Sequence, residues 1–139
     1  MPRYLVIANQ TVESPQLLDA IRQRAVDPFA TFHLLVPEDH STGMTWEEGR
    51  AHVDALRRLD DALEHFESAG IEMNGEVDVS PVDGTGNILR REGPGHFDEI
   101  LISTLPVTVS RWLKMDAPSR IARLTTVPVT HVVAVMSTS

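Results

Sequence analysis

The sequence predicts a single α/β domain of three layers, with a parallel sheet between two layers of helices. Residues 4–8 and 99–102 are short, uninterrupted apolar runs, typical of strands buried on both faces. Five strand-like segments alternate with four helical ones along 139 residues, a length that suits one domain. Such alternation builds right-handed βαβ units. We therefore expect a doubly wound sheet of order 3-2-1-4-5, with 4–8 and 99–102 as central strands.

The first helix is predicted from its start and stop signals. Ser14 and Pro15 suit the N-cap and the first helical position. Pro28 ends the helix, because the residue before a proline avoids the helical region. The second strand is expected at residues 32–36. The stripe that the first helix buries is predicted to be Leu17, Leu18, Ile21 and Ala25.

The longest helix is expected to run from a capping box at residues 45–48 to about Ala69, with Gly70 as its C-cap. Its segment is acidic: residues 38–67 carry nine acidic and three basic side chains, net −6. That charge favours a solvated outer face over an interaction surface. The predicted buried stripe is Val53, Leu56, Leu59, Leu63 and Phe66.

The second half of the chain continues the alternation. Residues 72–79 alternate and are less apolar, which favours a strand near a sheet edge. Asp83 is expected to cap a short helix that ends at the glycine–proline–glycine turn of residues 93–95. A further helix is expected near residues 116–125, and a valine-rich fifth strand at residues 127–136.

Composition excludes several classes of protein. Twelve basic and twenty acidic residues give a net charge of −8, which argues against binding a nucleic-acid backbone. The chain has no cysteine, which excludes disulfides and cysteine-ligated zinc and is typical of a reducing compartment. No apolar run approaches the ~20 residues of a membrane span, and the first residues lack the apolar core of a signal peptide. We expect a soluble cytoplasmic protein with no nucleic-acid or membrane partner.

Catalytic and metal-binding motifs are not found. The six histidines include no pair at ligand spacing on a helix, and no Gly-x-Ser-x-Gly elbow occurs. Gly84-Thr85-Gly86 is half of a dinucleotide fingerprint, but Leu89 stands where the third glycine belongs. We interpret that segment as a flexible helix start. No catalytic residue and no metal ligand is predicted, which makes an enzyme the weakest interpretation.

Segment 98–136 carries the most informative pattern. Asp98 and Glu99 lead into the apolar strand, and a turn with Trp112, a helix near Asp116 and a strand containing Pro128 follow. This order resembles the C-terminal part of the universal stress protein family, and the element order and length extend the resemblance to the whole chain. The resemblance implies that family's adenine nucleotide α-hydrolase-like fold. It also implies a homodimer, often formed through the last strand.

The family's nucleotide-binding members carry a Gly-x2-Gly-x9-Gly-Ser/Thr loop after strand four, whose backbone amides hold phosphates. Aligned without gaps, the four positions here hold Ser103, Pro106, Asp116 and Ala117. The family usually has Asp at the end of strand one, where Asn9 stands here. Pro106 has no amide hydrogen, and Asp116 brings a carboxylate that is expected to cap the next helix. We therefore expect ATP to bind weakly or not at all, and we assign no cofactor.

A ligand site is still expected where the strand order reverses, between strands one and four. Residues 103–139 carry net +3, so a nucleotide or another small anion remains a candidate ligand, against the alternative of a solvated amphipathic helix. Ala8 and the 106–116 loop are expected to add to the lining. The candidate ligand-binding residues are Asn9, Gln10, Val36, Pro37, Ser103, Thr104, Arg111, Asp116, Ser119 and Arg120.

Three functions remain open from the sequence. The first is a non-catalytic regulatory or interaction domain that does not bind ATP, and the second is a binding protein for a small anionic ligand. The third is an enzyme of the wider adenine nucleotide α-hydrolase-like group. For the first two we expect a homodimer centred on residues 127–136, because a long valine-rich edge strand is a liability unless it is paired.

Overall fold

The computed structural model describes residues 2–38, 48–106, 111–114 and 116–135. Its strands are β1 (Arg3–Ile7), β2 (Thr31–Pro37), β3 (Met73–Asp78), β4 (Glu99–Thr104) and β5 (Val129–Val133). Its helices are α1 (Pro15–Arg24), α2 (Glu48–Ser68), α3 (Pro81–Glu92), α4 (Arg111–Lys114) and α5 (Ala117–Ala122). The strands form one sheet of order β3-β2-β1-β4-β5, and every neighbouring pair is parallel. The predicted fold class and strand order are confirmed.

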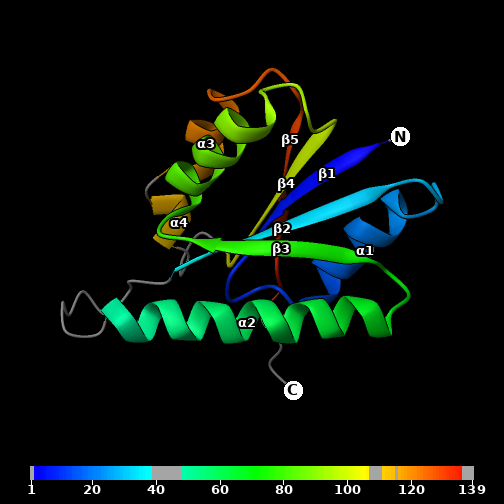
Figure 1. Ribbon diagram of the computed structural model, residues 1–139, viewed down its shortest axis with the longest axis horizontal. Helices are drawn as coiled ribbons and strands as arrows, with labels where there is room; N and C mark the ends of the chain where they lie inside the picture. The colour runs from blue at the N-terminus through cyan, green and yellow to red at the C-terminus, as the bar shows by residue number, and fades with distance from the viewer. Residues whose placement is uncertain (1, 39–47, 107–110, 115, 136–139) are drawn as a thin grey trace.

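Helices cover both faces of the sheet, and each face has its own apolar core (Figure 1). Val6 of β1 packs with side chains of α1 and α2, whereas Leu5 and Ile7 face α3 and α5. All three are fully buried, and burying such a side chain contributes roughly 1.5–3 kcal/mol. The alternation of one strand between two cores explains why its sequence is apolar throughout.

Serine hydroxyls start two of the helices. The Leu17 amide donates to Ser14 Oγ at 3.2 Å, which confirms the predicted cap of α1. In α3 the Asp83 amide donates to Ser80 Oγ at 3.0 Å, so Ser80 is the N-cap and the prediction for Asp83 is wrong. Asp83 lies instead in the first turn, where its charge suits the positive end of the helix dipole.

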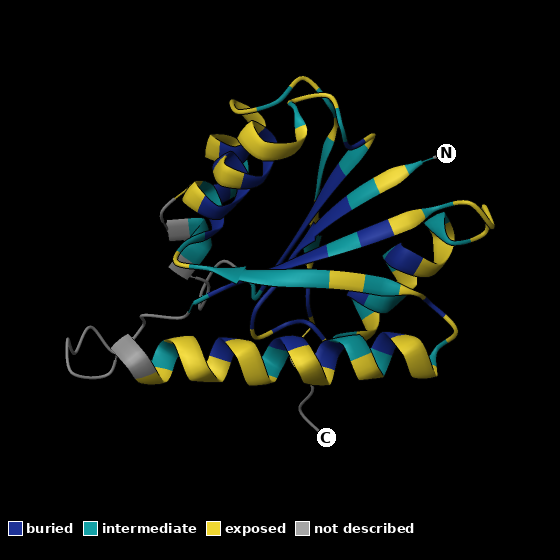
Figure 2. Cartoon of the chain, viewed as in Figure 1, coloured by how far each residue is buried: buried dark blue, intermediate teal, exposed yellow. Residues whose placement is uncertain are grey.

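The buried stripe of α2 differs from the prediction. Leu59 and Phe66 are buried, but Val53 and Leu56 are 52% and 43% exposed. Ala55 and Ala62 are buried in their place. The four buried positions follow a helical repeat, so the small alanines let α2 approach the sheet, and Figure 2 shows exposed residues along its outer side. The capping box falls on residues outside those described, while Gly70 has φ +81°, as a left-handed C-cap requires.

Strand β5 is shorter than predicted, with five residues rather than the span 127–136. Its partner β4 ends at Thr104, and a hydrogen bond from the Ala134 amide to the Thr104 carbonyl lies just beyond the end of β5. Pro106 follows and has no amide to extend the ladder. The helix expected near 116–125 is likewise confined to Ala117–Ala122. Among the described residues, no helix is long and apolar enough to cross a membrane.

Candidate ligand crevice at the carboxyl ends of the strands

The strand order reverses beside β1, which pairs with β2 on one side and β4 on the other. In such sheets the carboxyl ends of the strands at the reversal form the usual ligand crevice. Asn9 follows β1, Pro37 ends β2, and Ser103 lies near the end of β4. The structure thus brings the predicted residues from the two halves of the chain to one end of the sheet.

Asn9 ties three elements together at this end. Its side chain is buried; Nδ2 donates a hydrogen bond to the Pro37 carbonyl, and Oδ1 accepts one from Arg58 Nη1 of α2. Both ends of the amide are therefore engaged within the protein. An aspartate here would lack the donor for the Pro37 carbonyl, which gives a physical reason for asparagine.

Ser103 and Thr11 form a second internal contact. Their hydroxyl oxygens lie 2.6 Å apart, and both residues are buried, with exposed fractions of 1% and 4%. Each hydroxyl offers one hydrogen and accepts others, so this pair satisfies groups that would otherwise be buried without partners. In the ungapped alignment, Ser103 falls at the first glycine position of the family's nucleotide-binding loop. In this chain its hydroxyl hydrogen-bonds to Thr11.

Thr104 and His131 meet on the edge of the sheet. Thr104 Oγ1 donates to the Leu105 carbonyl at 2.9 Å and lies 2.7 Å from His131 Nε2. Because the threonine hydroxyl has a single hydrogen, the imidazole is the donor in the second contact. Burial lowers the pKa of His131, since desolvation disfavours the charged ring.

Asp116 does not cap α5, so that expectation is wrong. It occupies the N-cap position with φ 57°, in the left-handed region, and its exposed side chain makes no capping bond. An N-cap normally has extended backbone, which aims its side chain at the first-turn amides. Aspartate tolerates the left-handed conformation better than most residues, so the chain keeps there a backbone shape that glycine would also adopt.

The remaining predicted residues divide into two groups. Val36 and Pro37 are buried at the end of β2, and exposed Gln10 borders a cavity of about 460 Å³ between the β1–α1 loop and α2. Ser119 and Arg120 are exposed on α5, and neither side chain hydrogen-bonds to Asn9 or Ser103 in the described part of the chain. Arg111 begins α4, but its side chain lies outside the described part of the chain.

The sequence reasoning missed three residues of this crevice: Arg58, Thr11 and His131. Thr11 and Arg58 lie 92 and 49 residues from their partners along the chain. The one sequence signal was that Arg58 is among three basic residues in the acidic 38–67 segment. A lone arginine on a helix gives no indication of which strand end it reaches.

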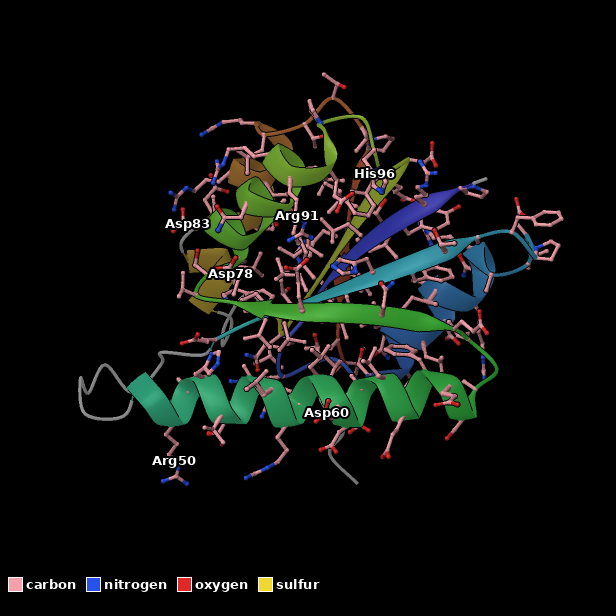
Figure 3. The ribbon with its side chains drawn as sticks, in the orientation of Figure 1. Arg50, Asp60, Asp78, Asp83, Arg91 and His96 are labelled. Atoms are coloured by element: carbon pink, nitrogen blue, oxygen red, sulfur yellow. The ribbon has the colours of Figure 1, made fainter. Side chains whose placement is uncertain are left out.

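A second polar cluster lies on the sheet face that α3 partly covers. His33 Nδ1 lies 2.6 Å from Asn74 Oδ1, and its Nε2 lies 2.7 Å from Glu76 Oε1. Arg91, labelled in Figure 3, donates to both oxygens of Glu76, and this lowers the pKa of the carboxyl. Both imidazole nitrogens of His33 have partners here. The arrangement suits a tie between β2, β3 and α3 better than a catalytic base, which needs a free nitrogen.

Two other motifs have structural roles. Gly84, Thr85 and Gly86 lie inside α3, where a side chain at Gly84 would meet Asp78 Cβ at 2.9 Å. The interpretation of this segment as a helix start is wrong, because α3 begins at Pro81; Gly84 lets the helix pack closely on β2 and β3, whereas a Cβ at Gly86 would meet only the Arg90 side chain. Among the described residues, no group of three His, Cys, Asp or Glu side chains is placed to hold a metal ion.

Comparisons with known proteins identify the fold. No protein-family profile and no curated protein matches the sequence. A universal stress protein from Archaeoglobus fulgidus superposes with a TM-score of 0.65 at 12% identity, over 95% of this chain and 93% of that one. The structure of the universal stress protein from Archaeoglobus fulgidus in complex with dAMP gives a TM-score of 0.63 at 14% identity, over 95% of this chain and 97% of that one. A universal stress protein in complex with cAMP gives 0.62 at 14% identity, over 96% and 98%. The chain therefore has the universal stress protein fold.

Proposed function

We propose that this chain is a non-catalytic regulatory or interaction domain of the universal stress protein family, and that it does not hold ATP through a glycine-rich loop. The fold and the sequence resemblance support the family assignment. The absence of cysteine from the 139 residues supports a cytoplasmic location.

One observation carries the proposal: the polar side chains at the strand ends are bonded to one another. Asn9 has partners on both ends of its amide, and the Thr11 and Ser103 hydroxyls pair at 2.6 Å. A phosphate or ribose entering here must break these bonds before it forms its own. Because buried polar groups lose their partners in that exchange, little net affinity remains.

The residues after β4 are also expected to weaken phosphate binding. Pro106 and Pro118 have no amide hydrogen to offer a phosphate, and exposed Asp116 adds a negative charge. A hydrogen bond to a charged group is worth roughly 1.5–3 kcal/mol. Losing two such donors therefore weakens binding by about a thousandfold, since each ~1.4 kcal/mol is tenfold.

Titration calorimetry with Mg-ATP at millimolar concentration tests the proposal. We expect no measurable heat of binding for the natural chain and recovered binding for a variant that combines Ser103→Gly, Pro106→Gly, Asp116→Gly and Ala117→Ser. The matched control is Gly95→Ala, which changes a loop glycine with nothing within 4 Å of the new Cβ. A micromolar dissociation constant for the natural chain contradicts the proposal. So does a folded loop variant that still ignores ATP.

A second candidate function is binding of a small anionic ligand without the loop. The dAMP and cAMP complexes of proteins with this fold favour it, as does the Arg58 guanidinium beside the strand ends. A thermal-shift series with AMP, cAMP, dAMP and inorganic phosphate separates the two candidates. Stabilisation that Arg58→Gln abolishes and Arg123→Gln preserves supports this second function, because Arg123 is exposed beyond α5. ATP turnover that survives purification supports an enzyme instead.

The proposal includes a homodimer through the last strand. The strand β5 is at the edge of the sheet. Val133 of β5 and Val135 just beyond it are apolar side chains that are 43% and 68% exposed. If the β5 strands of two copies pair, their edge backbone groups gain partners and their exposed valines are covered. Light scattering over a concentration series is expected to give a dimer, and Val133→Lys is expected to shift it towards monomer. A monomer at every concentration contradicts the dimer.

A further inference from the structure

The amino ends of β2 and β3 border an apolar groove against the last turns of α2, here called the α2 groove. Its volume is about 550 Å³, within the range of sites that accept a side chain or small ligand. Its floor, the apolar part of the lining, consists of the half-buried Leu63 and Met73 and the buried Phe32 and Ile71. Figure 1 shows α2 running alongside β3. Because the groove is lined by the first residues of β2 and β3, it lies at the opposite end of the sheet from the carboxyl-end crevice.

Two carboxylates stand at this groove without a cation. Glu67 and Glu72 line it, and both residues are exposed. Within the described part of the chain neither forms an ion pair. Glu67 also lies in the last turn of α2, where the negative end of the helix dipole disfavours a carboxylate. The fold thus tolerates an electrostatic cost at the groove that a bound cation would relieve.

The apolar surface continues beyond the groove. Phe29 is 65% exposed in the α1–β2 turn and directly precedes Ala30, which lines the groove; nearby Val26 is 82% exposed. An occupant that matches the whole surface must therefore be larger than a single small molecule.

Charge decides the class of occupant. Unpaired carboxylates repel phosphate, which excludes a nucleic-acid backbone and an anionic membrane from this surface. A segment with basic side chains is attracted to it, and an apolar side chain between them fits the floor. We propose that the α2 groove docks a basic, amphipathic segment of a partner protein, with one apolar residue on the floor and lysine or arginine against Glu67 and Glu72.

NMR titration with synthetic peptides tests the docking. The first probe is a short amphipathic peptide of lysine and leucine; the second replaces lysine with glutamate, and the third replaces leucine with serine. We expect the first probe to shift amide resonances of β2, β3 and the end of α2, more weakly at high salt because exposed charges are screened. The second probe should not bind, and the third should bind more weakly.

A charge-neutralising pair of variants sharpens the test. Glu67→Gln with Glu72→Gln keeps side-chain shape and should weaken the lysine–leucine peptide roughly tenfold, because two exposed charge pairs are lost. The matched control is Asp19→Asn with Asp83→Asn, which removes the same charge from α1 and α3. Equal weakening by both pairs overturns the proposal, as do shifts spread over the whole surface or preferential binding of the glutamate peptide. The docking rests on the proposed role as an interaction domain, but its test does not involve ATP, so its failure would leave the proposal about ATP binding unchanged.

Discussion

The crevice at the carboxyl ends of the strands and the α2 groove at their amino ends differ in how their polar side chains are paired. At the carboxyl end, Asn9, Thr11 and Ser103 are buried, and each bonds to another part of the chain. At the amino end, the α2 groove is open and its two glutamates have no cation among the described residues. Parallel sheets usually bind ligands at the carboxyl end. In this chain Asn9, Thr11 and Ser103 of that end are bonded within the protein, whereas Glu67 and Glu72 of the α2 groove have no cationic partner among the described residues.

Gly75 supports the amino end, and changing it gives the largest effect that we expect. A Cβ there would lie 2.6 Å from the Leu34 carbonyl oxygen and 2.6 Å from Leu59 of α2. Gly75→Ala therefore clashes with the backbone of β2 and requires the Leu59 side chain to move, and we expect a loss of about 3 kcal/mol in the free energy of unfolding. Urea denaturation measures this, and Gly95→Ala, with nothing near its Cβ, should stay within ~0.5 kcal/mol. Equal effects would show that α2 is not held closely on β3.

The hydroxyl pair tests the carboxyl end. Thr11→Val leaves Ser103 buried without its partner, so we expect a loss of about 2 kcal/mol. Ser103→Ala should cost a similar amount for the same reason. The double variant should be nearly as stable as the natural chain, because no polar group is then left unsatisfied. A double-mutant cycle on the free energy of unfolding measures the coupling, and additive losses would mean that the two hydroxyls do not depend on each other.

Glu99, at the amino end of β4, is expected to make the free energy of unfolding depend on pH. Arg24 Nε donates to Glu99 at 2.7 Å, and this bond together with that from Thr130 lowers the pKa of the carboxyl below 4.5. A lowered carboxyl pKa stabilises the fold above the unfolded value, and the gain is lost as pH falls through the folded value. Glu99→Gln should cost about 1.5 kcal/mol near neutral pH and almost nothing in strong acid. Unfolding free energies across this range check it, with unpaired Glu72→Gln as the control.

His131 of β5 is expected to add a smaller pH dependence to the free energy of unfolding. Burial lowers its pKa below 6.5, so the folded state favours the neutral ring. That contribution is present above 6.5 and is lost as pH falls through the folded value, because the unfolded chain binds the proton first. His131 is partly exposed, so solvent screens the effect and we expect less than ~0.5 kcal/mol. His131→Gln should flatten the stability profile just below 6.5, and an unchanged slope would contradict this.

Some features could be predicted because they depend on local pattern. The N-cap of α1 followed from Ser14 and Pro15, and the edge position of β3 followed from its weak apolar character. Errors came where two local patterns compete. Ser80 and Asp83 both suit an N-cap, and only the folded backbone selects between them. The stripe of α2 was misassigned because its large exposed residues outrank the buried alanines in any hydrophobic pattern.

The sequence by itself determined the sheet, because an uninterrupted apolar run such as residues 4–8 is stable only between two covered faces. It also placed Asn9 and Ser103 at the carboxyl ends of adjacent strands, through strand order alone. The tertiary structure decided what those side chains do. Arg58 reaches Asn9, and Thr11 reaches Ser103, from positions far along the chain. Hydrophobic periodicity does not predict such contacts, because it indicates which face of a helix or strand is buried and not which distant polar atom lies opposite it.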